Sequence, residues 1–180
     1  QGATNTFLLE SVVGGERFGR YSIIGLPAKT LIKVSGGAKH PTTQVITNST
    51  VTETDHGNPL DFVAQYHARF KVALTHGLPR FCGGLAGYFG YDTIRYIETK
   101  LAECNLSDEL NTPDILLMLT EELAVIDNLA GKLYLIVYAN PQEAGSYERA
   151  QARLSELRKS LNTSIDAPST TPSKKTDLIR

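Results

Sequence analysis

Short runs of apolar and β-branched residues, separated by glycine-containing turns, fill the first third of the chain. Val, Ile and Thr fit a pleated strand better than a helix, so each run predicts a β-strand. Asn48-Ser49 interrupts the longest run and predicts a turn within a hairpin. The predicted strands span residues 7–13, 20–25, 30–35 and 43–54.

Two stretches have helical periodicity instead. In the first, Asn58 can cap a helix, Pro59 suits its first position, and Gly77 ends it. The second is predicted to begin at Asn140-Pro141 and to carry one apolar stripe. The stripe consists of Ala144, Tyr147, Ala150, Leu154, Leu157 and Leu161.

Between the helices, residues 81–92 mix glycines with aromatic residues. They lack the Gly-Lys-Ser/Thr and Gly-x-Gly-x-x-Gly patterns of a phosphate-binding loop. Glycines in a strand mark the close approach of another backbone or of a ligand, so we expect a buried strand with aromatic walls. Further strands are predicted at residues 114–119, 123–126 and 132–138, with a hairpin turn at 127–131.

This order of elements predicts an α+β fold, with largely antiparallel β-sheet layers and flanking helices. We expect one domain over residues 1–161. Ser, Thr, Pro and Lys dominate residues 162–180, which predicts a linker. The chain begins at Gln1 rather than at a methionine and soon enters a strand, so we expect a piece of a longer protein.

Composition narrows the possible functions. The 180 residues carry a net charge of −1 with acids and bases interspersed, which predicts no nucleic-acid partner. No apolar run is long enough to span a membrane, and no signal peptide is evident. Cys82 and Cys104 form neither a disulfide framework nor a metal-ligand spacing. A cytoplasmic protein is therefore expected.

Glu10 is the residue of greatest chemical interest, because it interrupts the apolar strand 7–13. Both faces of that strand are mostly apolar, so we expect it to be buried, and a buried carboxylate needs a cation or several donors. Arg17 or Arg20 could supply that cation inside the fold, or the ammonium group of a ligand could. Hydroxyl groups of Ser11, Tyr21 and Ser22 are expected nearby.

Four stretches carry a family resemblance. They are residues 7–11, residues 15–25, residues 83–96, and Pro113-Asp114 together with the 127–136 hairpin. In this order they resemble the N-terminal region of anthranilate synthase component I. The aminodeoxychorismate synthase component is the nearest alternative, and a structural half-domain that binds no ligand is the other.

The resemblance implies an aminating lyase that converts chorismate to anthranilate and pyruvate with Mg²⁺ and ammonia. A glutamine amidotransferase partner supplies the ammonia, and tryptophan inhibits. By the same resemblance, half of the tryptophan site lies in this chain, and the catalytic and Mg²⁺-binding residues lie in a C-terminal domain beyond it. The residues we assign to the tryptophan site are Leu9, Glu10, Ser11, Arg20, Tyr21 and Ser22.

Overall fold

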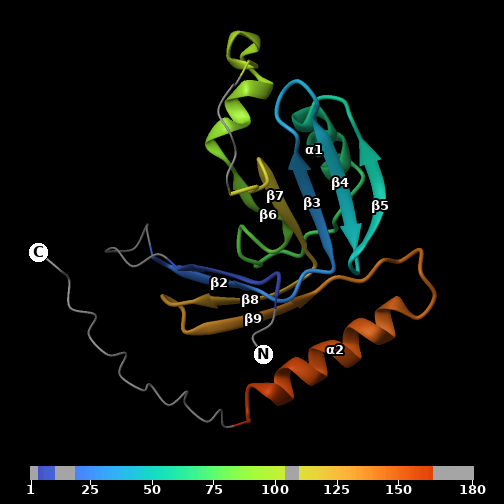
Figure 1. Cartoon of the computed structure of the whole chain (residues 1–180). Helices are drawn as coiled ribbons and strands as arrows, with labels where there is room; N and C mark the ends of the chain where they lie inside the picture. Colours follow the sequence, from blue (N-terminus) through green and yellow to red (C-terminus); the bar gives the residue numbers. More distant parts are fainter. Residues whose placement is uncertain (1–3, 11–18, 104–109, 164–180) are drawn as a thin grey trace, which may run out of the picture.

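Two antiparallel sheets stand at a steep angle to each other in the computed structural model, which describes residues 4–10, 19–103 and 110–163 (Figure 1). Sheet A has the strand order β1-β2-β8-β9, and sheet B has the order β5-β4-β3-β7-β6. The strands are β1 Phe7–Glu10, β2 Tyr21–Gly25, β3 Thr30–Ser35, β4 Thr42–Thr47, β5 Thr50–Asp55, β6 Gly84–Phe89, β7 Ile115–Thr120, β8 Glu122–Asp127 and β9 Lys132–Val137. The predicted α+β fold with antiparallel sheets is confirmed.

The larger core lies between sheet B and helix α1 (Pro59–Ala68). Alternate residues of β3 and β7 point into it, as the period of a strand requires. Asn58 caps α1 by accepting a hydrogen bond from the backbone N–H of Leu60 at 2.9 Å. The core consists of Ile32, Val34, Val45, Phe62, Tyr66, Ile115 and Leu117.

The chain passes between the sheets at Glu121, which separates β7 from β8, and the segment before β6 also contacts sheet A and the residue that follows it. The Tyr138 hydroxyl donates to the carbonyl oxygen of Cys82 at 2.8 Å, and burial raises the pKa of Tyr138 to about 12. The rings of Phe7 and Phe81 meet edge to face with centroids 6.4 Å apart. One face of sheet A is thus packed against the segment that enters β6.

Both helices differ from their predicted bounds. Helix α1 ends at Ala68 rather than near Gly77, and Leu74 beyond it is 70% exposed. Helix α2 (Ser146–Ser160) begins six residues after Asn140, whose side chain instead accepts a hydrogen bond from the Gln142 N–H within a turn. Between these helices lie two short 3₁₀ helices, η1 (Tyr91–Tyr96) and η2 (Thr99–Leu101).

Two strands are more exposed than expected. Strand β6 was expected to be buried but forms an edge of sheet B, and its Phe89 side chain is 52% exposed. Strand β1 was also expected to be buried, yet it forms an edge of sheet A with Leu8 at 60% and Leu9 at 52% exposure. Apolar residues on both faces therefore did not mean burial within the described part of the chain.

No helix among the described residues is both long and apolar enough to cross a membrane. Most of the predicted linker, residues 164–180, lies outside the described residues, so the domain boundary at residue 161 stays a prediction.

Candidate functional site

Glu10 and Ser22 form a cross-strand pair at the edge of sheet A. Strands β1 and β2 are antiparallel, and their register sets Glu10 directly opposite Ser22. Cross-strand partners share one face of a sheet, and here the Ser22 hydroxyl approaches Glu10 Oε1 at 3.5 Å. Ser22 is buried, whereas Glu10 is exposed. The carboxylate therefore has one hydroxyl beside it and an open side where a cation could bind.

Arg20 does not pair with Glu10. Its guanidinium makes a two-pronged contact with Asp127 at the end of β8, with Nε 3.0 Å from Oδ1 and a terminal nitrogen 2.7 Å from Oδ2. Asp127 is only 1% exposed. Arg17 and Arg20 were the two predicted internal partners of Glu10. Arg20 is thus excluded as that partner, and Arg17 lies outside the described residues.

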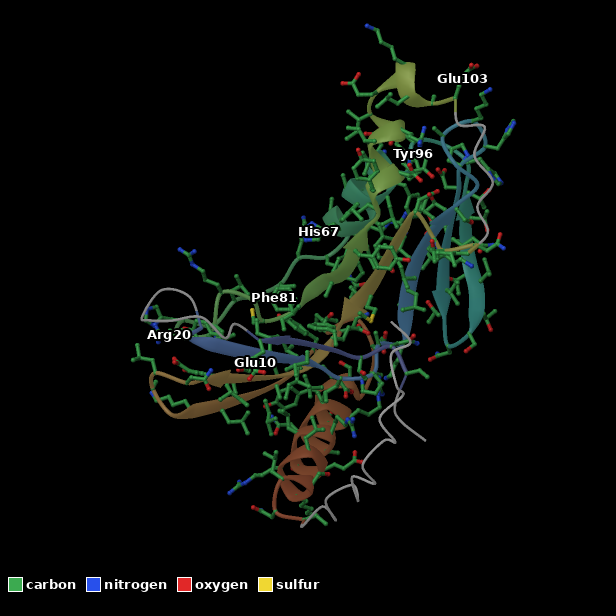
Figure 2. All side chains as sticks on the ribbon, turned by 60° about the vertical axis from the view of Figure 1, so that its left-hand side comes forward. Glu10, Arg20, His67, Phe81, Tyr96 and Glu103 are labelled. Carbon is green, nitrogen blue, oxygen red and sulfur yellow. The ribbon has the colours of Figure 1, made fainter. Side chains whose placement is uncertain are left out.

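The other predicted site residues divide between the two faces of sheet A. Leu9 pairs in register with Ile23, and Tyr21 pairs with Asp127, so these side chains occupy the face opposite Glu10 and Ser22. The Arg20 guanidinium lies over the Tyr21 ring, 4.9 Å from its centroid. Figure 2 shows Arg20 at the outer end of these strands and Phe81 above them. Ser11 lies outside the described residues.

Sequence reasoning missed the turn between β8 and β9 as a neighbour of this site. Asn128 Nδ2 contacts Ser22 Oγ at 3.2 Å, although 106 residues separate them. The Asn128 N–H donates to the carbonyl of Arg20 at 2.8 Å. The hairpin at 127–131 was predicted, but nothing in its sequence indicates which strand lies beside it.

The Arg20–Asp127 pair makes acid stability a measurable property of this region. Hydrogen bonds from Arg20, and further ones from the N–H groups of Leu129 and Ala130, lower the pKa of Asp127 from 3.8 to about 2. A carboxylate with a lowered pKa stabilises the fold above its unfolded pKa, and that stability is lost as the pH falls through the folded value. The contribution is therefore complete above about pH 4 to 5 and disappears towards pH 2.

Asp127→Asn is expected to lower the midpoint of thermal unfolding at pH 7 by several degrees, because Arg20 loses its charged partner. The difference between parent and variant should narrow as the pH falls from about 4 to 2. Asn140→Ala, in a turn elsewhere, serves as the control. Its unfolding midpoint should differ from that of the parent by the same amount at every pH. A constant difference at all pH values would mean that the Asp127 charge does not contribute.

A divalent metal does not fit the described part of the chain. Among these residues no three His, Cys, Asp or Glu side chains are grouped closely enough to hold an ion. The one acidic side chain of the candidate site with a buried carboxylate, Asp127, is already bound to a guanidinium. The arrangement at Glu10 is instead suited to a ligand that presents an ammonium group, since a carboxylate and a hydroxyl oxygen both accept its hydrogen bonds.

Comparison with known proteins gives consistent matches. The sequence family described as chorismate binding enzyme matches residues 17–179. Anthranilate synthase component 1 of Neisseria meningitidis serogroup C is 52% identical over 177 residues, which cover 97% of this chain and 35% of that protein. The component 1 of Pseudomonas aeruginosa is 50% identical, covering 91% of this chain and 32% of that protein.

Among solved structures, anthranilate synthase component I from Streptococcus pneumoniae TIGR4 superposes with a TM-score of 0.62 at 27% identity. The match covers 88% of this chain and 32% of that one. The chain thus spans about a third of the length of the curated relatives that it matches.

Proposed function

The chain belongs to the family of chorismate binding enzymes, and we propose that it is the N-terminal, regulatory region of an anthranilate synthase component 1. The observation that carries this proposal is 52% identity across 97% of the chain to a protein of that name. The full-length protein would convert chorismate and ammonia to anthranilate and pyruvate, as an aminating lyase of the cytoplasm. Its Mg²⁺ site and catalytic residues would lie outside this chain, and an amidotransferase subunit would supply the ammonia.

Within this proposal, sheet A carries half of a feedback site for tryptophan. Glu10 would face the ammonium group of the amino acid, with Ser22 beside it. Glu10 is exposed and Arg20 is bound to Asp127, so the Glu10 carboxylate is accessible to a ligand ammonium. The exposed Leu8, on the same face of β1 as Glu10, leaves apolar surface for the indole ring.

Two alternatives are less well supported. An aminodeoxychorismate synthase component would share the layout, but the relatives at 52% and 50% identity carry the anthranilate synthase name. A structural half-domain without a ligand would best be supported by an internal partner for Glu10. In the described ranges no guanidinium or ammonium lies within ion-pair distance of that carboxylate.

The proposal predicts that the full-length protein forms anthranilate and that the isolated 180-residue chain does not. Both proteins would be given chorismate, Mg²⁺ and ammonium, and anthranilate would be followed by its fluorescence. Tryptophan should inhibit the full-length protein. Anthranilate formed by the pure isolated chain would contradict the assignment of catalysis to the remainder. Aminodeoxychorismate as the product of the full-length protein would favour the folate branch.

A further inference from the structure

We propose that Asn128 is a positioning residue of the ligand site, which orients Glu10 through the Ser22 hydroxyl. This inference rests on the proposed function, because the ligand in question is the one that Glu10 would bind. Asn128 belongs to the turn between β8 and β9 and reaches the site only because β8 is the neighbour of β2.

The contacts of Asn128 determine which end of its amide faces Ser22. Its Nδ2 lies 3.3 Å from the carbonyl oxygen of Gly19 and 3.2 Å from Ser22 Oγ. A carbonyl oxygen only accepts hydrogen bonds, so the atom beside Gly19 has to be the nitrogen of the amide. The same nitrogen has two protons, and the second points to Ser22.

This orientation of the amide determines the direction of the hydrogen bonds from Asn128 through Ser22 to Glu10. Ser22 accepts from Asn128, so its single hydroxyl proton remains available for Glu10 Oε1, which lies 3.5 Å away. That distance is long for a hydroxyl donor, and the contact is correspondingly weak before a ligand binds. A hydroxyl proton directed at one carboxylate oxygen leaves the other oxygen of Glu10 for an ammonium group.

The turn that carries Asn128 is itself firmly held. The backbone N–H of Asn128 donates to the Arg20 carbonyl at 2.8 Å, and Asp127 Oδ1 accepts from the N–H groups of Leu129 and Ala130 at 3.2 and 3.1 Å. The Asp127–Arg20 ion pair joins the same turn to the start of β2. Asn128 therefore has a fixed place from which to orient a neighbouring side chain.

The test measures tryptophan inhibition of the full-length protein with Asn128→Ala, Ser22→Ala and the double variant. Asn128→Ala should weaken inhibition about fivefold, the effect of one neutral hydrogen bond. On the Ser22→Ala background the same change should add almost nothing, because Asn128 acts through that hydroxyl. Additive effects of the two single variants would overturn the proposal, and so would parent-like inhibition in Asn128→Ala.

Asn128→Asp provides a second and stronger variant. An aspartate has no proton for Ser22, so the hydroxyl would turn its own proton away from Glu10. The added negative charge would by itself favour the ammonium group, so weaker inhibition can come only from the lost orientation of that hydroxyl. We expect weaker inhibition than in Asn128→Ala. Inhibition equal to that of the parent would overturn the proposal. Asn140→Ala, which changes a turn asparagine after β9, is the matched control. Tryptophan should inhibit this variant as strongly as it inhibits the parent.

The Glu10→Gln variant separates this inference from the proposed function. If Glu10→Gln and Ser22→Ala leave tryptophan inhibition unchanged, the ligand is not bound here and both proposals fail. If they weaken inhibition while Asn128→Ala and Asn128→Asp do not, the site stands and the positioning role of Asn128 is wrong.

Discussion

Glu10→Gln is expected to weaken tryptophan inhibition of the full-length protein about tenfold to a hundredfold. A hydrogen bond to a charged group contributes about 1.5–3 kcal/mol, and removing the charge of Glu10 deprives the ligand ammonium of such a partner. The substitution preserves the shape of the side chain, and Glu10 is exposed, so the fold should tolerate it. The measurement is the inhibition constant for tryptophan beside the uninhibited rate.

Glu148→Gln is the matched control, because Glu148 is an exposed glutamate on α2. Tryptophan should inhibit this variant as strongly as it inhibits the parent. Unchanged inhibition in Glu10→Gln would remove Glu10 from the site. A collapse of the uninhibited rate together with the inhibition would instead identify Glu10 as a structural residue, which was the alternative that the sequence left open.

The two hairpins could be predicted because their sequence signals are local. Asn48-Ser49 and residues 127–131 join neighbouring strands through short turns, and both hairpins form where the sequence placed them. The end of helix α1 could not be predicted in this way. The apolar spacing continues to Leu74, yet the residues after Ala68 find no sheet to pack against, as the exposure of Phe70, Val72 and Leu74 indicates.

The burial of β1 was predicted wrongly for a related reason. Its apolar residues do indicate a packed strand, but burial depends on what covers the strand, and Leu8 and Leu9 remain exposed in the described part of the chain. These two side chains lie on opposite faces of the sheet, so each face of β1 exposes one leucine. An apolar pattern along a strand therefore does not by itself predict its burial, which depends on the elements that pack against it.

The candidate site was predicted only where its residues are close in sequence. Glu10 and Ser22 come from consecutive strands, so their pairing follows from a simple hairpin-like order. Arg20 and Asp127 are 107 residues apart, and both arginines near Glu10 were equally plausible partners for it. Only the placement of β8 beside β2 assigns Arg20 to Asp127 and brings Asn128 to Ser22.

Gly87→Ala is expected to destabilise the chain by about 3 kcal/mol, a large fraction of the stability of an ordinary domain. The glycines of residues 81–92 were predicted to mark the close approach of another backbone or of a ligand, and at Gly87 the neighbour is a backbone. A Cβ atom there would lie within van der Waals overlap of the Leu116 carbonyl oxygen and 2.9 Å from Leu117 Cα. Both atoms belong to the backbone of β7, so relief requires β6 and β7 to separate.

Gly37→Ala is the control, because an added Cβ atom at Gly37 would meet no other atom. Gly37 has a φ of +67° but nothing within 4 Å of its missing Cβ, so this substitution should cost only the backbone strain, about 1–2 kcal/mol. Urea unfolding of both variants gives the two free energies, and hydrogen exchange shows where the loss occurs. Gly87→Ala should speed exchange of the amides that join β6 to β7, whereas Gly37→Ala should not. Gly87 does not have a positive φ, so its loss would come from the contact with β7. A loss no larger than that of Gly37→Ala would mean that β7 accommodates the added Cβ atom.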